Sequence, residues 1–245
     1  MLPADAHNAA ASWAHPVLMR VANRMPVANR LLAALPRTEY RRLLASLEPV
    51  TLAFGEVLYE PGDAIRHVYF PNDSLVSLIT LADRQLALEV GMVGREGLVG
   101  VSLVLGIALS PVRALVQGGG TAMRMKAASF RRELRQSLSL QRGILLYTHE
   151  LMVQVAQTAA CNRFHVVEAR LARWLLMTRD RVGSDHFRLT QEFIGHMLGV
   201  RRVGVTNAAH ALKQRKLIDY SRGNIEIING PGLEAAACAC YKLAG

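Results

Sequence analysis

Two adjacent arginines, Arg201 and Arg202, follow the dipeptide Gly199-Val200 inside a stretch that otherwise has the apolar spacing of a helix. The planar guanidinium group of arginine can donate two hydrogen bonds to O6 and N7 of guanine. The positive end of a helix dipole disfavours a cation, so paired arginines at a helix start need an anion or a strong acceptor as partner. These residues therefore predict recognition of phosphates and base edges.

The segment that carries these arginines, residues 189–218, predicts two short helices joined at Gly199. Glycine supplies the positive φ that a sharp turn after a helix requires, and Thr190 is the predicted N-cap residue of the first helix. The second helix is expected to bury four apolar residues at helical spacing, namely Val205, Ala208, Ala209 and Leu212. This arrangement is a helix-turn-helix, whose second helix lies in the major groove of DNA.

The polar residues of this region divide into two predicted groups. The expected base contacts are Arg201, Arg202, Thr206 and Asn207. The expected contacts with the DNA backbone are Thr190, Gln191, His210, Lys213 and Arg222. Residues 216–228 predict a β-hairpin with Ser221-Arg222-Gly223-Asn224 at its tip. The helix pair and the hairpin together predict a winged helix.

An amphipathic helix is expected just before this motif, over residues 166–185, ending near Gly183. Its inward residues are predicted to be Val167, Leu171, Trp174 and Leu175, and its outward residues Arg170, Arg173 and Arg179. The last third of the chain is also the more basic part. Residues 163–245 carry thirteen basic and seven acidic residues, and the other 162 residues carry sixteen and twelve. This surplus of positive charge is typical of a protein that binds a polyanion. Net charge alone is equally compatible with a basic protein that has no such partner.

The three cysteines offer little chemistry on the sequence alone. Cys238 and Cys240 are one residue apart, and two thiolates are too few to hold a metal ion, so no metal site is predicted. Cys161 is a candidate redox switch, but a buried packing role is favoured. An odd number of cysteines and a poor secretory signal favour a reducing cytoplasm. No apolar run reaches the ~18 residues of a membrane-spanning helix.

The rest of the chain predicts an α+β protein with four parts: a tail (residues 1–30), an antiparallel β-sandwich or β-barrel (31–137), a long helix (138–162) and the DNA-binding domain (163–245). Short β-branched or aromatic runs alternate with turn residues after a short amphipathic helix at 37–47. A strand pair is expected across the turn at 118–120.

The long helix is apolar around most of its circumference, so it must be covered on more than one side. One side is expected to lie on the barrel and the other on the same helix of a second copy, across a two-fold axis. The predicted dimer contacts are Ile144, Leu145, Leu151, Met152 and Val155. The alternative is a helix at the centre of a single core.

The order of these parts resembles the Crp–Fnr superfamily of bacterial transcription regulators over residues 31–230. The resemblance rests on "LYEPGDAIRHVYFPNDSLVSLI", "GREGLVGVSLVLG", a long helix and "LTQEFIGHMLGVRRVGVTNAAHALKQRKLI". It implies a jelly-roll sensor barrel like a cyclic-nucleotide-binding domain, a long dimerisation helix and a winged helix-turn-helix. It also implies a homodimer on a palindromic operator in double-stranded DNA, with RNA polymerase as a candidate partner and no enzymatic activity.

The chain departs from this family's pattern in the barrel. Val101 stands where a ribose-binding glutamate is expected, and Val112 stands where a phosphate-binding arginine is expected. Arg113 is one place along, on the opposite face of a strand. Burial of a cyclic nucleotide requires its polar groups to be satisfied, so cyclic AMP is not expected to bind. The N-terminus also lacks the cysteine cluster of an iron–sulfur sensor, so no cofactor is predicted and the effector stays open.

The recognition residues depart from the pattern too. Family members often carry Arg-Glu followed by a second arginine four places on, whereas Arg202 is followed by Val203 and Asn207. The operator is therefore expected to differ at the positions that those residues read. Two other interpretations remain open. A cupin-like barrel enzyme would need clustered metal ligands, and a protein-interaction module would need acidic or apolar residues on the recognition surface.

Overall fold

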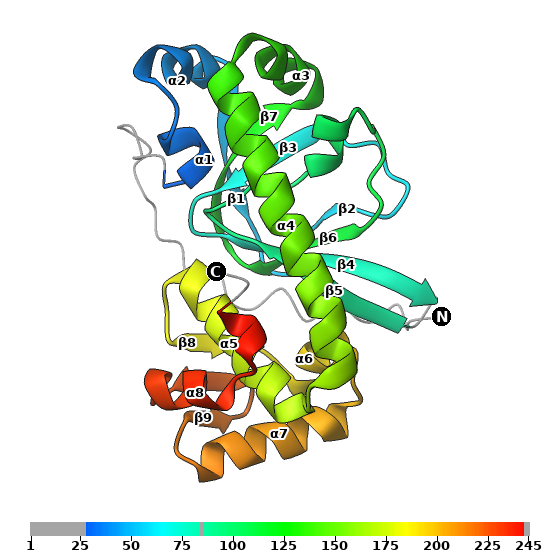
Figure 1. Cartoon of the computed structure of the whole chain (residues 1–245), viewed down its shortest axis with the longest axis vertical. Coiled ribbons are helices and arrows are strands. Elements are labelled where there is room, and N and C mark those ends of the chain that lie inside the picture. The colour runs from blue at the N-terminus through cyan, green and yellow to red at the C-terminus, as the bar shows by residue number, and fades with distance from the viewer. Residues whose placement is uncertain (1–27, 84–85, 243–245) are drawn as a thin grey trace.

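The computed structural model describes residues 28–83 and 86–242 (Figure 1). The chain has the predicted α+β fold, in which two antiparallel sheets come first, then a long helix, then a smaller helical domain with its own sheet. The predicted tail lies outside the described residues as far as residue 27. Helix α1 (Arg30–Ala33) begins at the buried N-cap residue Asn29, whose side-chain amide donates to the carbonyl oxygens of Pro71 and Gly97.

The N-terminal domain, called the barrel domain below, consists of two sheets that share one core. One sheet has the strand order β1 (Leu47–Leu52), β7 (Gly120–Lys126), β3 (His67–Pro71). The other has the order β2 (Val57–Tyr59), β6 (Arg113–Gly118), β4 (Leu75–Asp83), β5 (Leu86–Val93). Every pairing within them is antiparallel. Apolar side chains from both sheets meet in a single cluster, so the predicted sandwich is confirmed.

Strands form on both sides of the glycine run at 118–120, as predicted, but the expectation that they pair with each other is wrong. Strand β6 pairs with β2 and β4, whereas β7 pairs with β1 and β3, so the chain changes sheets at these glycines. A Cβ on Gly120 would lie 2.8 Å from the backbone nitrogen of Ser74. The glycines therefore permit a crowded corner between the two sheets and not a hairpin turn.

Helices cover one side of this domain. The short helix predicted at 37–47 is α2 (Arg37–Leu44), and a 3-10 helix (Val101–Leu105) and α3 (Ala127–Gln136) follow later in the chain. Helix α4 (Leu138–Phe164) is 27 residues long and begins at Ser137, whose side chain accepts a hydrogen bond from the backbone N–H of Leu140. It runs along the outside of the sheets toward the C-terminal domain (Figure 1).

The inward face of α4 belongs to the barrel core, which corrects part of the predicted dimer surface. Ile144 is fully buried and Leu151 is 7% exposed, and both pack in the barrel cluster. These two residues are therefore not available to a second copy in this conformation. Leu145, Met152 and Val155 lie on the outward face, where they are 50%, 66% and 37% exposed.

The C-terminal domain is built on α5 (Val167–Val182) and a three-stranded sheet ordered β8 (His186–Arg188), β10 (Asn224–Ile227), β9 (Ile218–Ser221). It closes with α8 (Gly230–Ala236) and a 3-10 helix at Ala239–Tyr241. Its apolar core also includes Leu75, Ile79 and Met92 from the barrel, so the two domains are packed together. Within the described part of the chain, no helix is long and apolar enough to cross a membrane.

Candidate DNA-binding interface

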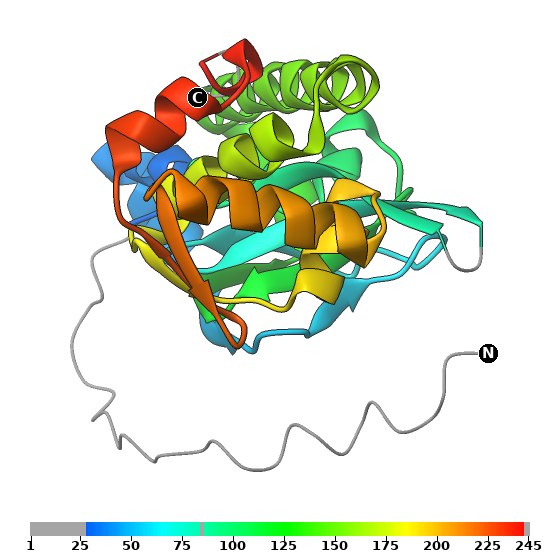
Figure 2. The same ribbon diagram turned by 90° about the horizontal axis from the view of Figure 1, so that it is seen from below.

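The predicted helix-turn-helix is confirmed. Helix α6 (Gln191–Leu198) begins at Thr190, whose side-chain oxygen accepts from the N–H of Phe193 at 3.1 Å, and it ends at Gly199, where φ is +62°. Helix α7 (Arg202–Gln214) follows after a three-residue turn; it lies at the lower end of the molecule in Figure 1 and faces the viewer in Figure 2. A Cβ on Gly195 would lie 2.9 Å from the carbonyl oxygen of Val200, so a glycine is needed there for the turn to fold back on α6.

Helix α7 has the two faces that the sequence predicted. Val205, Ala208, Ala209 and Leu212 are buried, and the helix packs against α5. The opposite face exposes Arg201, Arg202, Thr206, Asn207, His210 and Lys213. Arg201 is the N-cap residue and offers no side-chain hydrogen bond to the helix. The two guanidinium groups thus stand at the positive end of α7 and point out of the protein, although their contacts with DNA stay predictions.

Several of the predicted DNA contacts are held by neighbours within the chain. The Thr206 hydroxyl lies 2.7 Å from Gln191 Oε1, which links α7 to the start of α6. The His210 ring lies 2.9 Å from the Gln214 amide, one turn further along α7. These contacts orient polar side chains of α6 and α7 within the chain, and such preorganisation would reduce the entropy lost if these residues bind DNA as predicted.

The wing forms as predicted. Strands β9 and β10 are joined by Arg222 and Gly223, which both have positive φ (+49° and +84°), as a two-residue turn with the right twist requires. Lys213 Nζ lies 2.6 Å from the carboxylate of Asp219 on β9, so part of its charge is already neutralised at the base of the wing. We therefore expect Arg222 to be the stronger phosphate contact of these two cations.

A groove separates the recognition helix from the wing. It is lined by Thr190, Gln191, Glu192, Arg202, Tyr220, Arg222 and Gly223. Arg202 contributes a cation from the first turn of α7, and Arg222 contributes another from the wing. A groove with cations from two different elements can follow a phosphate backbone while the exposed helix face reaches the bases.

Two arginines that were expected to face solvent are buried, which is a correction to the predicted face of α5. Arg170 is 8% exposed and Arg173 is 6% exposed. Arg170 Nη2 donates to the carbonyl oxygen of Leu198 and to Asn162 Oδ1, which is 2.6 Å away. Leu198 ends α6, so the cation of Arg170 lies at the negative end of that helix dipole. Arg170 therefore helps to hold the helix-turn-helix in place.

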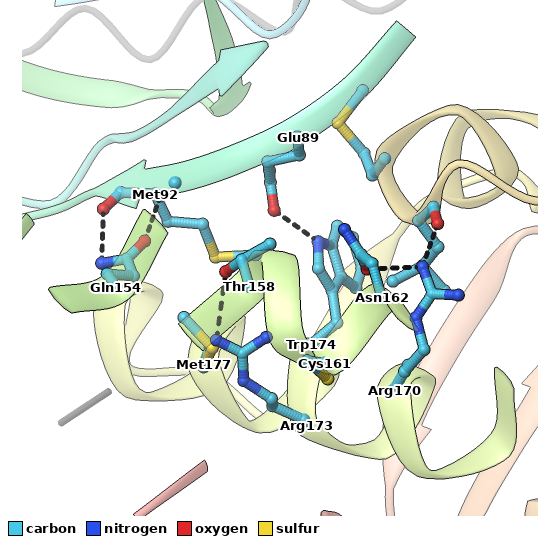
Figure 3. A pocket seen from close by; sticks show the side chains of 13 residues that line it. Glu89, Met92, Gln154, Thr158, Cys161, Asn162, Arg170, Arg173, Trp174 and Met177 are labelled. Carbon is cyan, nitrogen blue, oxygen red and sulfur yellow. Dashed lines mark hydrogen bonds between the residues drawn. The ribbon is translucent and has the colours of Figure 1, made fainter. Parts of the chain in front are cut away.

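These arginines belong to a polar junction between the barrel and the DNA-binding domain, which surrounds a small pocket (Figure 3). Trp174 Nε1 on α5 donates to Glu89 Oε1 on β5 at 2.8 Å. Gln154 on α4 accepts from the backbone N–H of Met92 at 2.5 Å. The junction thus links a barrel strand to the helices that carry the recognition helix. No local pattern in the sequence indicates these two bonds, because their partners are 62 and 85 positions apart.

Glu89 is a buried acid of this junction, and its surroundings shift its pKa. Burial raises the pKa of its carboxyl group to about 7, against the opposing influence of hydrogen bonds from Ser77 and Trp174 and of the charges of Arg181 and Arg173. An acid whose pKa is raised in the folded state stabilises the fold fully below its unfolded pKa, near 4.5. That stability is lost as the pH rises through about 7, because the unfolded chain then releases its proton more readily.

We expect Glu89→Gln to be more stable than the parent protein at pH 8, by about 3 kcal/mol. Glutamine keeps the oxygen that accepts from Trp174 but carries no buried charge. The two proteins should converge below pH 4.5, where glutamate becomes protonated in the unfolded chain as well as in the folded protein. Urea unfolding at several pH values measures the difference, with the exposed substitution Glu234→Gln as control. A stability difference that does not change with pH would show that Glu89 does not titrate in this range.

The comparison with known proteins agrees with this geometry. Residues 169–236 match the family model of the Crp-like helix-turn-helix domain. No curated protein matches the chain. Among solved structures, a putative transcriptional regulator of the Crp/Fnr family from Eubacterium rectale is 17% identical, with a TM-score of 0.64 over 84% of this chain and 97% of that one. FixK2 from Bradyrhizobium japonicum is 15% identical, with a TM-score of 0.67 over 79% and 98%.

A third similar structure is the c-di-GMP responsive global regulator CLP of Xanthomonas campestris, which is 16% identical, with a TM-score of 0.65 over 78% of this chain and 99% of that one. The matched domain and the exposed recognition helix define a DNA-binding transcription regulator. Residues 169–236 therefore carry a Crp-like helix-turn-helix domain, and the chain shares the fold of solved Crp/Fnr regulators.

Proposed function

We propose that the protein acts as a homodimer that binds a palindromic operator through α7 and responds to a signal other than cyclic AMP. The observation that carries this proposal is the first turn of α7, which presents Arg201 and Arg202 outward beside the groove and the wing. DNA is the partner for which such a face is suited. RNA polymerase is the candidate protein partner, the cytoplasm is the expected compartment, and no enzymatic role is assigned.

The outward face of α4 supports the dimer. Leu145 and Met152 are seven residues apart, and so are Leu146 and Val153. All four side chains are at least 39% exposed in the single chain. Apolar residues that recur every seven positions form the seam of two supercoiled helices. A second α4, related by a two-fold axis, would cover this seam and place two recognition helices on one duplex.

Selection from a random duplex library with the full-length protein tests this function. We expect enrichment of an inverted repeat whose half-site centres are about 10 base pairs apart, because two-fold protein symmetry imposes the same symmetry on the operator. Enrichment of a single unrepeated site would contradict the dimer. A failure to enrich any sequence, with binding to all duplexes alike, would contradict sequence-specific regulation.

Two valines stand where a cyclic nucleotide would need a carboxylate and a cation. Val101 and Val112, at the two positions expected to bind ribose and phosphate, pack against the barrel core. Arg113 forms an ion pair with Glu60 at 2.9 Å. A phosphate buried here would face valine side chains, and its lost hydration would not be replaced. These contacts support a signal of another kind.

We therefore expect cyclic AMP at millimolar concentration to leave the melting temperature of the protein unchanged. A ligand that binds only the folded state must raise it by mass action. Differential scanning fluorimetry measures the effect, and the selected operator duplex serves as the positive control. A saturable rise with submillimolar cyclic AMP would contradict the role given to Val101 and Val112.

A further inference from the structure

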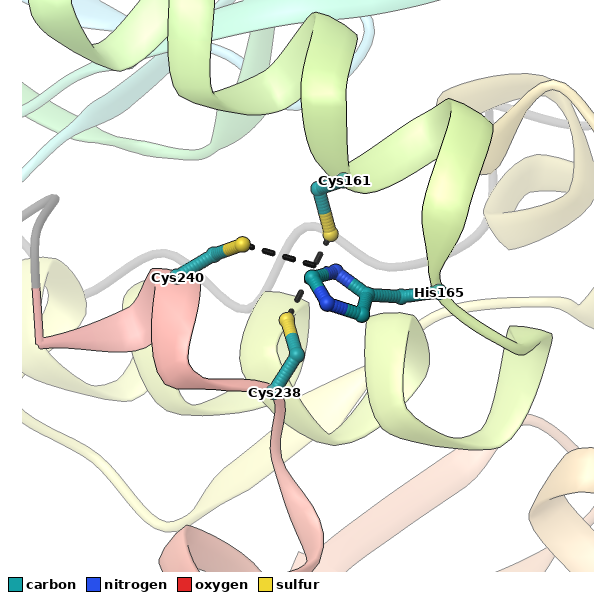
Figure 4. A group of neighbouring side chains, drawn as sticks. All are labelled: Cys161, His165, Cys238 and Cys240. Atoms are coloured by element: carbon teal, nitrogen blue, oxygen red, sulfur yellow. Dashed lines mark hydrogen bonds between the residues drawn. The ribbon is translucent and has the colours of Figure 1, made fainter.

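The three cysteines of the chain converge with one histidine (Figure 4). The expectation that Cys238 and Cys240 have no further ligand within reach is wrong, because the fold brings Cys161 and His165 beside them. Cys161 and His165 are four residues apart, at the end of α4 and its C-cap. Cys238 and Cys240 follow α8, so two segments almost eighty residues apart in sequence meet here.

The spacing of the four ligand atoms fits one small ion. The three Sγ atoms and a ring nitrogen of His165 all lie within 4.8 Å of one another. The Sγ atoms of Cys161 and Cys238 are 3.4 Å apart, and Cys240 Sγ is 3.4 Å from His165 Nδ1. A zinc tetrahedron with bonds of about 2.3 Å to sulfur has edges of about 3.8 Å, so only small movements are needed.

Burial and charge also favour a metal here. Cys161, Cys238 and Cys240 are 1%, 9% and 3% exposed, so water does not compete for the site. Three thiolates with Zn²⁺ carry one net negative charge. Arg170 and Arg173 are buried and line the same small pocket as Cys161. The Nε atoms of both arginines lack a hydrogen-bond partner within the described part of the chain. A buried anion beside them would explain why two cations are tolerated in this place.

We propose that Cys161, His165, Cys238 and Cys240 form a closed, structural Zn²⁺ site. Such a Cys3His set has four protein ligands and leaves no position for substrate, as structural zinc sites do. Gln157, one turn before Cys161 on α4, donates a hydrogen bond from Nε2 to Cys240 Sγ at 2.8 Å and would orient this ligand.

The site would act as a clamp on the joint between the two domains. Helix α8 packs against α5, and the 3-10 helix that contains Cys240 packs against both α4 and α5. A metal bound to all four ligands would tie the C-terminal segment to the point where the long helix meets the DNA-binding domain. Loss of the metal would let the DNA-binding domain change its orientation relative to α4 more freely.

Metal content is the direct test, and it does not depend on DNA binding. The full-length protein is purified in the presence of a non-chelating reductant and analysed by inductively coupled plasma mass spectrometry, then stripped with a chelator and titrated with Co²⁺. We expect one zinc per chain, and thiolate-to-cobalt absorption with the strong visible bands of a tetrahedral site. Zinc should also raise the melting temperature of the stripped protein.

Ligand variants complete the test. Cys240→Ser and His165→Ala should each lower zinc affinity by more than about a hundredfold. Removal of a residue that only hydrogen-bonds a ligand, as Gln157 does, typically lowers metal affinity by about 10–100-fold. His149→Ala, an exposed histidine on the same helix, should bind like the parent protein. Equal binding by all variants would overturn the site. So would a reduced parent protein that retains no metal and gives no cobalt spectrum, or oxidation to a Cys161–Cys238 disulfide as the only chemistry of the cluster.

Discussion

Met152→Glu is expected to convert the protein from a dimer into a monomer that remains folded. Met152 is 66% exposed on the single chain, so the substitution should not disturb the barrel core. In the dimer it would place a carboxylate from each chain within an apolar seam. Such burial of unpaired charge costs at least about 3 kcal/mol, which weakens association more than a hundredfold. Sedimentation equilibrium at micromolar concentration, with circular dichroism to verify folding, measures both parts of the expectation.

A matched control keeps this result interpretable. Ala235→Glu adds the same charge at an exposed position on α8, away from α4, and should leave the dimer intact. Leu151→Glu is unsuitable as a test of the seam, because Leu151 packs in the barrel core and its replacement would unfold the domain. A folded dimer of Met152→Glu as stable as the parent dimer would show that the outward face of α4 is not the interface.

The helix-turn-helix could be predicted from the sequence because its signals are local. Thr190 caps one helix, Gly199 ends it with a positive φ, and apolar residues at helical spacing then mark the buried face of α7. The wing is equally local, since Arg222 and Gly223 supply the turn between two short β-runs. Each of these features is determined by residues within a few positions of one another, where propensity and periodicity apply.

The errors concern contacts between distant segments. Periodicity placed Arg170 on the polar face of α5, but α4 and α6 cover that face as well, and Asn162 and Leu198 accept its hydrogen bonds. Cys161 and Cys238 are 77 positions apart, and nothing in the spacing of either indicates that they meet. The same limit applies to α4, where an all-round apolar pattern could not separate Ile144, which faces the barrel, from outward residues such as Met152.

The second large effect is expected at Arg202. If its guanidinium group donates to O6 and N7 of guanine, Arg202→Ala should cost about 1–3 kcal/mol at each half-site, and therefore about 2–6 kcal/mol on the dimer's operator. Arg202→Lys keeps the charge but loses the two-pronged donor geometry. It should retain non-specific binding while losing most of the preference for the operator.

Arg222→Ala is the matched comparison, because Arg222 lines the same groove as Arg202 but belongs to the wing. Loss of the Arg222 side chain should weaken binding to every DNA sequence alike. It should also reduce the steepness with which the logarithm of the binding constant falls with the logarithm of the salt concentration, by about one unit per chain. Lys213→Ala should have a smaller effect than Arg222→Ala, since the ion pair with Asp219 already neutralises part of the lysine charge.

The most direct measurement of base recognition by α7 is a fluorescence-anisotropy titration of the parent protein, Arg202→Ala and Arg202→Lys. Each is titrated against the selected operator and a scrambled duplex at several salt concentrations. We predict that both variants lose affinity for the operator and that Arg202→Lys binds the scrambled duplex as the parent does. If Arg202→Ala weakens both duplexes by the same factor, Arg202 contacts phosphate alone, and base recognition from the first turn of α7 is contradicted.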